Sequence, residues 1–158
     1  MISVRKATDS DLQTLYGFQQ GIVEAERPFD PTLKPGVLHY YDLRQVIRSD
    51  NAIVLVAEEN GEILGAGSAE IRPAKDYLAH SHYIYLGFMF TRPEARGKGV
   101  NKKILDELMD WSRTKGIKEI RLEVYAGNAV ARQAYEKAGF KDHLIEMRFE
   151  SGESFTSI

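Results

Sequence analysis

The pattern of apolar and polar positions at the start of the chain predicts a strand followed by a helix. Residues 2–7 alternate, with Ile2, Val4 and Ala7 set against polar neighbours, as in a short half-buried strand. Thr8-Asp9-Ser10-Asp11 then supplies N-cap candidates for a helix with apolar residues near one face. Those apolar residues are Leu12, Leu15, Tyr16, Phe18 and Ile22.

The middle of the chain predicts a loop, a second helix and a hairpin. Residues 24–36 contain three prolines, which favours a loop, and a helix is expected from about Val37 to Arg48. Two apolar runs, 52–57 and the residues from Ile63 onward, flank Asn60-Gly61. An Asn-Gly pair between two such runs is the strongest short-range signal of a β-hairpin.

A long apolar run follows the loop 73–79 and predicts a central strand over residues 82–91. Apart from its first residue the run is apolar on both faces, so we expect other elements to cover it on both sides. Gly87 interrupts the strand, which is typical of a bulge or of close approach of a ligand to the protein backbone. A packing gap filled by a neighbouring aromatic side chain is an equally good explanation.

Helices and strands alternate after residue 91. A helix-period segment covers 100–115, a strand-like run covers 117–125, and a further helix is expected from Asn128. The whole pattern predicts a single α/β domain over residues 1–150, with a strongly curved mixed sheet and helices on both faces. Residues 151–158 are expected to form a short, frayed polar tail.

Composition excludes several classes of protein. The chain has 158 residues, the size of one domain, and a net charge of −2, whereas a nucleic-acid binder would normally carry a basic face. The absence of cysteine excludes a disulfide framework, a thiolate metal site and a cysteine nucleophile. The four histidines are scattered without metal-ligand spacing, so no metal is expected.

The sequence gives no sign of a membrane segment. The N-terminus lacks the apolar core of a signal peptide, and no run approaches the roughly 18 apolar residues that span a bilayer. We therefore expect a cytoplasmic protein without a membrane partner.

The segment Arg96-Gly97-Lys98-Gly99-Val100-Asn101 is the most informative in the chain. It joins a predicted strand to a predicted helix and places two glycines at the start of that helix. The first turn of a helix has N–H donors without internal partners and a partly positive end. Glycines let an anion approach these donors and Lys98 adds a full charge, so the segment predicts a phosphate-binding site.

A second motif, in Asn128 to Phe140, follows about thirty residues later. Together the two segments resemble the GCN5-related N-acetyltransferases, which have a pyrophosphate loop followed by an Asn-Ala-Tyr-Gly-Phe segment at fixed spacing. The residues on the family's positions are Arg96, Gly99, Asn128, Ala131, Tyr135, Gly139 and Phe140. Asn101 departs from the usual Gly or Ala, although Asn tolerates turn geometry better than most residues.

The resemblance implies acetyl-CoA as co-substrate and a central strand that carries a bulge and splays from its neighbour. The residues expected at the cofactor are Met89, Phe90, Thr91, Arg96, Gly97, Lys98, Gly99, Val100, Asn101, Lys102, Asn128 and Tyr135. Asn128 is also a good N-cap for its own helix, and both roles can hold together.

The same resemblance implies two catalytic residues. Tyr135 is expected to be the general acid beside the thioester sulfur, although it could simply pack against the alanines near it. Glu123 is the candidate general base, and the alternative is a solvated carboxylate or one paired with Arg121.

The expected activity is transfer of an acetyl group from acetyl-CoA to a primary amine by direct attack in a ternary complex. A small amine or an amino-acid-like acceptor is favoured. The alternatives are a protein N-terminal or lysine acetyltransferase and a non-catalytic acetyl-CoA-binding regulatory module. Glu24, Glu26 and Asp30 would favour a cationic acceptor, but Arg27 and Lys34 dilute that signal. A homodimer is one expected state of assembly.

Overall fold

The structure of the chain, a computed structural model, describes residues 1–152. The predicted tail, 151–158, therefore lies mostly outside the described residues. The elements in chain order are β1 (Ser3–Lys6), η1 (Asp9–Asp11), α1 (Leu12–Glu26), α2 (Leu43–Arg48), β2 (Ala52–Glu59), β3 (Glu62–Pro73), β4 (His82–Thr91), η2 (Pro93–Ala95), α3 (Val100–Thr114), β5 (Ile120–Arg121) and α4 (Ala129–Lys137).

The chain divides into two compact units, each described by itself. The first, Met1–Tyr125, contains the sheet and the helices α1 to α3, and the second begins at Ala126 and contains α4. The prediction of one domain over residues 1–150 stays a prediction.

Within the described residues, five strands form one sheet in the order β1-β2-β3-β4-β5. The first four pair antiparallel and β5 pairs parallel to β4, so the sheet is mixed as predicted. Asn60 and Gly61, with φ of 52° and 79°, form the tight connection between β2 and β3. Two positive φ angles match a type I′ turn, which confirms the predicted hairpin.

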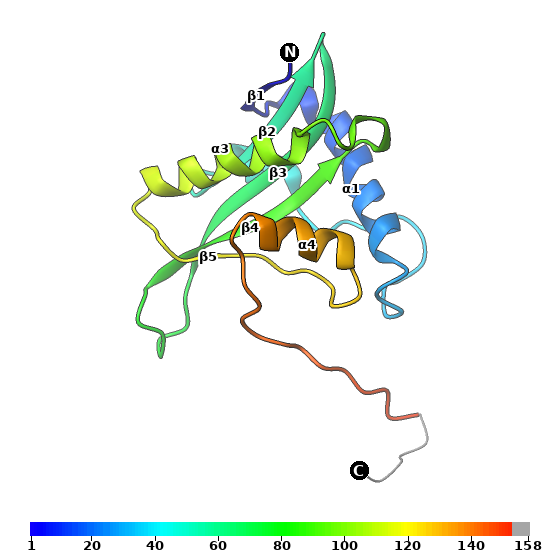
Figure 1. Ribbon diagram of the computed structural model, residues 1–158, viewed down its shortest axis with the longest axis vertical. Helices are drawn as coiled ribbons and strands as arrows, with labels where there is room; N and C mark the ends of the chain where they lie inside the picture. The colour runs from blue at the N-terminus through cyan, green and yellow to red at the C-terminus, as the bar shows by residue number, and fades with distance from the viewer. Residues whose placement is uncertain (153–158) are drawn as a thin grey trace. The chain divides into compact units, whose positions relative to one another are not determined.

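Helices cover both faces of this sheet (Figure 1). Ala66 on β3 belongs to the buried cluster that α1 and α2 build with Leu15, Phe18 and Ile47. Its neighbour Gly67 instead faces α3, whose Ile104 and Leu108 lie 2.7 Å and 3.2 Å from the position a Cβ would take. Because successive strand residues point to opposite faces, α3 lies on the face opposite α1 and α2.

The second helix is shorter than predicted. The sequence pattern predicts a helix over 37–48, whereas α2 begins at Leu43, with the Asp42 side chain accepting a hydrogen bond from the Gln45 N–H at 3.2 Å. The backbone of residues 38–41 bonds instead to two glutamine side chains of α1. These long-range bonds replace the helical ones because they satisfy the same backbone groups.

β4 carries the expected bulge. Ser68 pairs with Gly87 while Ala66 pairs with Phe90, so β4 has one extra residue between these pairs. Phe88 lies in this stretch with φ of 53°. A Cβ on Gly87 would lie 2.7 Å from the Tyr41 hydroxyl oxygen, so the bulge and the aromatic packing predicted as alternatives occur together.

β4 and β5 separate soon after they meet. The run 117–125 predicts a long strand, but the ladder contains only Ile84–Ile120 and Tyr85–Arg121, while β4 continues to Thr91. The second half of β4 therefore has no strand partner on its β5 side within the described residues.

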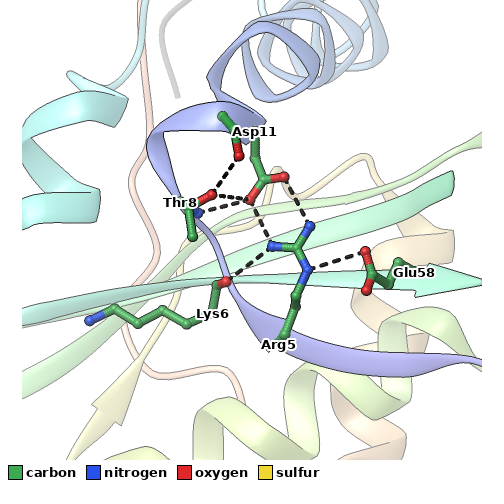
Figure 2. Close-up of polar contacts among 6 residues, drawn as sticks. Arg5, Lys6, Thr8, Asp11 and Glu58 are labelled. Atoms are coloured by element: carbon green, nitrogen blue, oxygen red, sulfur yellow. Dashed lines mark hydrogen bonds and ion pairs between the residues drawn. The ribbon is translucent and has the colours of Figure 1, made fainter. Parts of the chain in front are cut away.

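A polar cluster ties the first strand to the start of α1 (Figure 2). The Arg5 guanidinium donates two hydrogen bonds to the Asp11 carboxylate, at 2.8 Å and 3.0 Å, and pairs with Glu58 at 3.1 Å. The Thr8 N–H donates to Asp11 at 2.8 Å. Asp11 is only 5% exposed, and the hydrogen bond from Arg5 holds its pKa below the ordinary value.

Replacing Asp11 by Asn should lower the free energy of unfolding by about 1–3 kcal/mol, because Arg5 and the Thr8 N–H lose a buried charged acceptor. A carboxyl whose pKa is lowered by folding contributes stability above its unfolded pKa and loses it as the pH falls through the folded value. Urea unfolding of the wild type should therefore show a loss of stability below about pH 4 that is smaller in D11N.

Asp9→Asn is the matched control. Asp9 pairs with Arg48 at 2.6 Å, but both side chains are more than half exposed, so its removal should cost less than about 1 kcal/mol. Equal losses in D9N and D11N would contradict the structural role given to Asp11.

Candidate functional site

The end of β4 is joined to α3 by η2 and then by a turn at residues 96–99. Gly97 and Gly99 both have a left-handed backbone, with φ of 79° and 80°. A Cβ at either position would meet no atom within 4 Å, so the backbone angle, and not crowding, requires glycine here. Residues 96–99 are exposed, which leaves this backbone open to a ligand.

The first residue of α3, which follows this turn, packs against β3. Val100 is buried, and its Cγ1 lies 2.8 Å from the position of a Cβ on Gly65, so the absence of that Cβ lets Val100 sit directly on β3. The first-turn N–H groups of a helix have no internal acceptor and carry partial positive charge. The turn and the helix start together form a cradle suited to a phosphate group.

The basic side chains around the cradle differ in their contacts. Arg96 and Lys98 are exposed within the turn itself. Lys102 pairs with Asp106 at 2.6 Å on the surface of α3, an exposed pair of small energetic value. Asn101 continues α3 without a break, so its departure from the family pattern leaves the helix start intact.

The three residues predicted at the end of β4 are largely committed to packing. The Phe90 ring lies 4.7 Å from the Phe18 ring on the α1 side. The Met89 sulfur lies 2.6 Å from the Cβ position of Gly67, on the α3 side. Both side chains are nevertheless only partly buried. The Thr91 hydroxyl oxygen is buried and has no hydrogen-bond partner within the described residues.

Gln19 and Tyr41, to which the sequence analysis gave no role at the bulge of β4, are linked to it by hydrogen bonds. Gln19 is 0% exposed, and its side-chain oxygen accepts hydrogen bonds from the backbone N–H groups of Tyr40 and Tyr41, both at 3.0 Å. The Tyr41 hydroxyl accepts a hydrogen bond from the Phe88 N–H at 3.3 Å, and burial raises the pKa of this tyrosine. The signals for this arrangement in the sequence were a glutamine on the apolar side of α1 and Gly87 within the predicted strand.

The loop after α1 carries Asp30, one of the acidic residues expected to favour a cationic acceptor, and we call this loop the acceptor side. It is bonded to the end of the first unit. The Tyr125 hydroxyl donates a hydrogen bond to Asp30 at 2.6 Å, and the Phe29 and Tyr125 rings stack at 6.4 Å. Burial, followed by the charge of Asp30, raises the pKa of Glu26 at the end of α1. An aromatic and acidic surface of this kind is complementary to a cationic group.

Glu123 is exposed and lies beyond the short strand β5. Its charge is among the smaller causes that raise the pKa of Tyr41 and Tyr85. Arg121 pairs with Glu119 at 3.1 Å. The alternative in which Glu123 pairs with Arg121 therefore loses support, and the role of Glu123 as a base stays a prediction.

Asn128 and Tyr135 belong to the second unit. The Asn128 side chain accepts a hydrogen bond from the Ala131 N–H at 3.2 Å, which confirms the predicted N-cap of α4. The Tyr135 ring lies 5.9 Å from the Phe140 ring in an edge-on arrangement. The roles predicted for both residues at the cofactor stay predictions.

Within residues 1–152, no group of three or more His, Asp or Glu side chains could hold a metal ion. None of the helices in the same range has both the length and the apolar character needed to cross a membrane.

Comparison with known proteins identifies similar chains. The family model described as "Acetyltransferase (GNAT) family" matches residues 19–140. An N-acetyltransferase of Bacillus subtilis, YhfO, is 28% identical over 63% of this chain and 66% of its own length. An aminoglycoside N(6')-acetyltransferase type 1 of Salmonella typhimurium is 24% identical over 68% of this chain and 75% of its own.

Solved structures share the fold. A predicted acetyltransferase of Clostridium acetobutylicum, crystallised with acetyl-CoA, superposes with a TM-score of 0.75 at 21% identity. The superposition covers 95% of this chain and 96% of that one.

Proposed function

This chain belongs to the acetyltransferase (GNAT) family of enzymes, and from that premise we propose that it transfers the acetyl group of acetyl-CoA to the primary amine of a small acceptor. The observation that carries the proposal is the turn from Arg96 to Gly99, in which two left-handed glycines open the start of α3. Acetyl-CoA supplies an activated thioester and a pyrophosphate suited to such a cradle.

The donor side is the part of the proposed site that binds acetyl-CoA. Its proposed contacts come more from the backbone than from side chains. The N–H groups from Gly97 to Lys102 would hold the pyrophosphate, with Arg96 and Lys98 adding positive charge. The part of β4 that no longer pairs with β5 has backbone groups that could bond the amides of the pantetheine arm, as an added strand would. Asn128 is proposed as a further contact of that arm.

The reaction needs two proton transfers. A neutral amine attacks the thioester carbonyl, so that a C–N bond forms, the C–S bond breaks and the amine loses a proton. Glu123, or a water molecule, is proposed to take this proton. Tyr135 is proposed to protonate the departing thiolate.

The acceptor proposed here is a small amine that carries positive charge. Glu26, Asp30 and the aromatic pair Phe29–Tyr125 provide a surface complementary to a cation. The aminoglycoside acetyltransferase among the relatives acts, by its name, on a molecule with amino groups. An amino-acid-like amine fits the same surface. A cytoplasmic location and a homodimer stay predictions.

The test is a binding and turnover experiment on the purified chain. At a hundredfold excess over its dissociation constant, acetyl-CoA should stabilise the protein by about 2.7 kcal/mol, measured as a rise in melting temperature. NAD and ATP serve as controls and should give no such rise. Release of free CoA should then be measured with a panel of amines that includes an aminoglycoside, free amino acids and peptides.

Each outcome discriminates between functions. A melting temperature unmoved by acetyl-CoA would contradict the proposal. Stabilisation without CoA release by any amine would favour a regulatory acetyl-CoA-binding module. Efficient acetylation of peptides, with small amines ignored, would favour a protein acetyltransferase.

A further inference from the structure

Two adjacent glutamines of α1 hold the segment 38–41 in place. The Gln20 side chain donates to the Leu38 carbonyl at 2.7 Å and accepts from the Leu38 N–H at 3.2 Å. Gln19, fully buried, accepts from the N–H groups of Tyr40 and Tyr41. A buried amide oxygen with two donors has a fixed orientation, so the backbone of Tyr41 has a defined position relative to α1.

The side chain of Tyr41, whose backbone is fixed in this way, contacts the bulge of β4. Its hydroxyl accepts the hydrogen bond of the Phe88 N–H, and its ring meets the Phe88 ring edge-on at 5.8 Å. The Tyr41 hydroxyl also lies close to Gly87: a Cβ on this residue would be only 2.7 Å from the hydroxyl oxygen. Three contacts of one side chain therefore converge on two consecutive residues of β4.

The bulge needs such support because its geometry is unfavourable. Phe88 has φ of 53°, a left-handed backbone that is unfavourable for a bulky L side chain. A strained residue keeps its conformation only where its surroundings enforce it. The ring contact with Tyr41 and the hydrogen bond that the Phe88 N–H donates to the Tyr41 hydroxyl supply that enforcement.

We propose that Tyr41 is a positioning residue for acetyl transfer, acting through its hydrogen bond to the Phe88 N–H and held in register by Gln19. The inference rests on the proposed function, because β4 lines the donor side of the proposed site. Tyr41 comes from the segment after α1, on the acceptor side, and its contact with the bulge fixes the acceptor-side segment to the donor-side strand. The expected consequence of losing the hydroxyl is therefore a slower transfer step with binding retained.

Tyr41→Phe removes the hydroxyl and keeps the ring. Its kcat should fall about tenfold, which corresponds to a rise of roughly 1.4 kcal/mol in the activation free energy. The KM values for acetyl-CoA and amine should change less than twofold. Tyr83→Phe is the matched control, because it removes a tyrosine hydroxyl from β4 itself, before the bulge, and its kcat should be unchanged.

Gly87→Ala adds a second test. The new methyl group would press on the Tyr41 hydroxyl, so G87A should lower kcat strongly in the wild-type background and less in the Y41F background. A non-additive double-mutant cycle is the signature of two groups that act together. Additive effects would overturn the proposed link.

Hydrogen exchange at the Phe88 amide gives a readout that does not depend on turnover. Exchange should become faster in Y41F and stay unchanged in Y83F. Unchanged exchange, an unchanged kcat, or an effect confined to the acceptor KM would overturn the role of Tyr41. A wild-type chain that shows neither acetyl-CoA binding nor turnover would instead count against the proposed function, and the positioning role in transfer would fall with it.

Discussion

Tyr135→Phe should keep acetyl-CoA binding and lose between about a hundredfold and ten-thousandfold in turnover, the usual cost of removing a general acid. The substitution keeps the aromatic ring, so the edge-on contact with Phe140 at 5.9 Å is retained and α4 should stay folded. The missing hydroxyl leaves the departing thiolate without its proposed proton donor. Single-turnover release of CoA, combined with a calorimetric dissociation constant for acetyl-CoA, measures the two properties separately.

The structural alternative for Tyr135 makes a different prediction. If Tyr135 only packs, Y135F should turn over normally, while a truncation such as Y135A should lower the melting temperature. A loss of acetyl-CoA binding in Y135F would also contradict the acid role, because a group that acts mainly in the transition state changes kcat more than ground-state binding.

Gly99→Val should weaken acetyl-CoA binding about tenfold or more and also destabilise the fold. Gly99 has φ of 80° and ψ of 14°, a conformation that costs an L-residue roughly 1–2 kcal/mol. A Cβ there would touch nothing within 4 Å, so the loss of stability would come from backbone strain and not from a clash. The branched side chain would also stand where a phosphate group has to approach the N–H donors.

Gly116→Val is the matched control for this strain. Gly116 lies just beyond the other end of α3, with φ of 68° and no atom within 4 Å of a Cβ. Urea unfolding should show similar losses of stability in G99V and G116V, while titration with acetyl-CoA should show weaker binding in G99V alone. Equal affinities in the two variants would contradict the proposed phosphate site.

Local patterns were enough to predict much of the first unit. The Asn60-Gly61 pair predicted the hairpin because a type I′ turn needs two positive φ angles, a requirement of two adjacent residues. The period of α3 and the glycines before it predicted the strand–turn–helix unit, because helix periodicity and glycine backbone freedom are local properties. The fold class followed from the order of such units.

The positions of Tyr41 and of the acceptor side could not be predicted in this way. Residues 38–41 carry a helix-like pattern, but Gln19, about twenty residues earlier, accepts hydrogen bonds from the N–H groups of Tyr40 and Tyr41. The run after residue 117 looked like a long strand, yet its pairing with β4 stops at Arg121. In each case the structure of the segment depends on a partner elsewhere in the chain, α1 for residues 38–41 and β4 for the run after 117, which the local pattern does not contain.

The sequence by itself determined where the glycine turn before α3 would lie and which family motifs surround it, since both depend on residues close together in the chain. Only the tertiary structure decided that Tyr41 supports the predicted bulge of β4 and that Asp30 bonds to Tyr125. These contacts join residues tens of positions apart, and their formation depends on the packing of α1 against the sheet. Hydrogen bonds and ring contacts of that kind follow from which surfaces are buried together, and no local pattern encodes them.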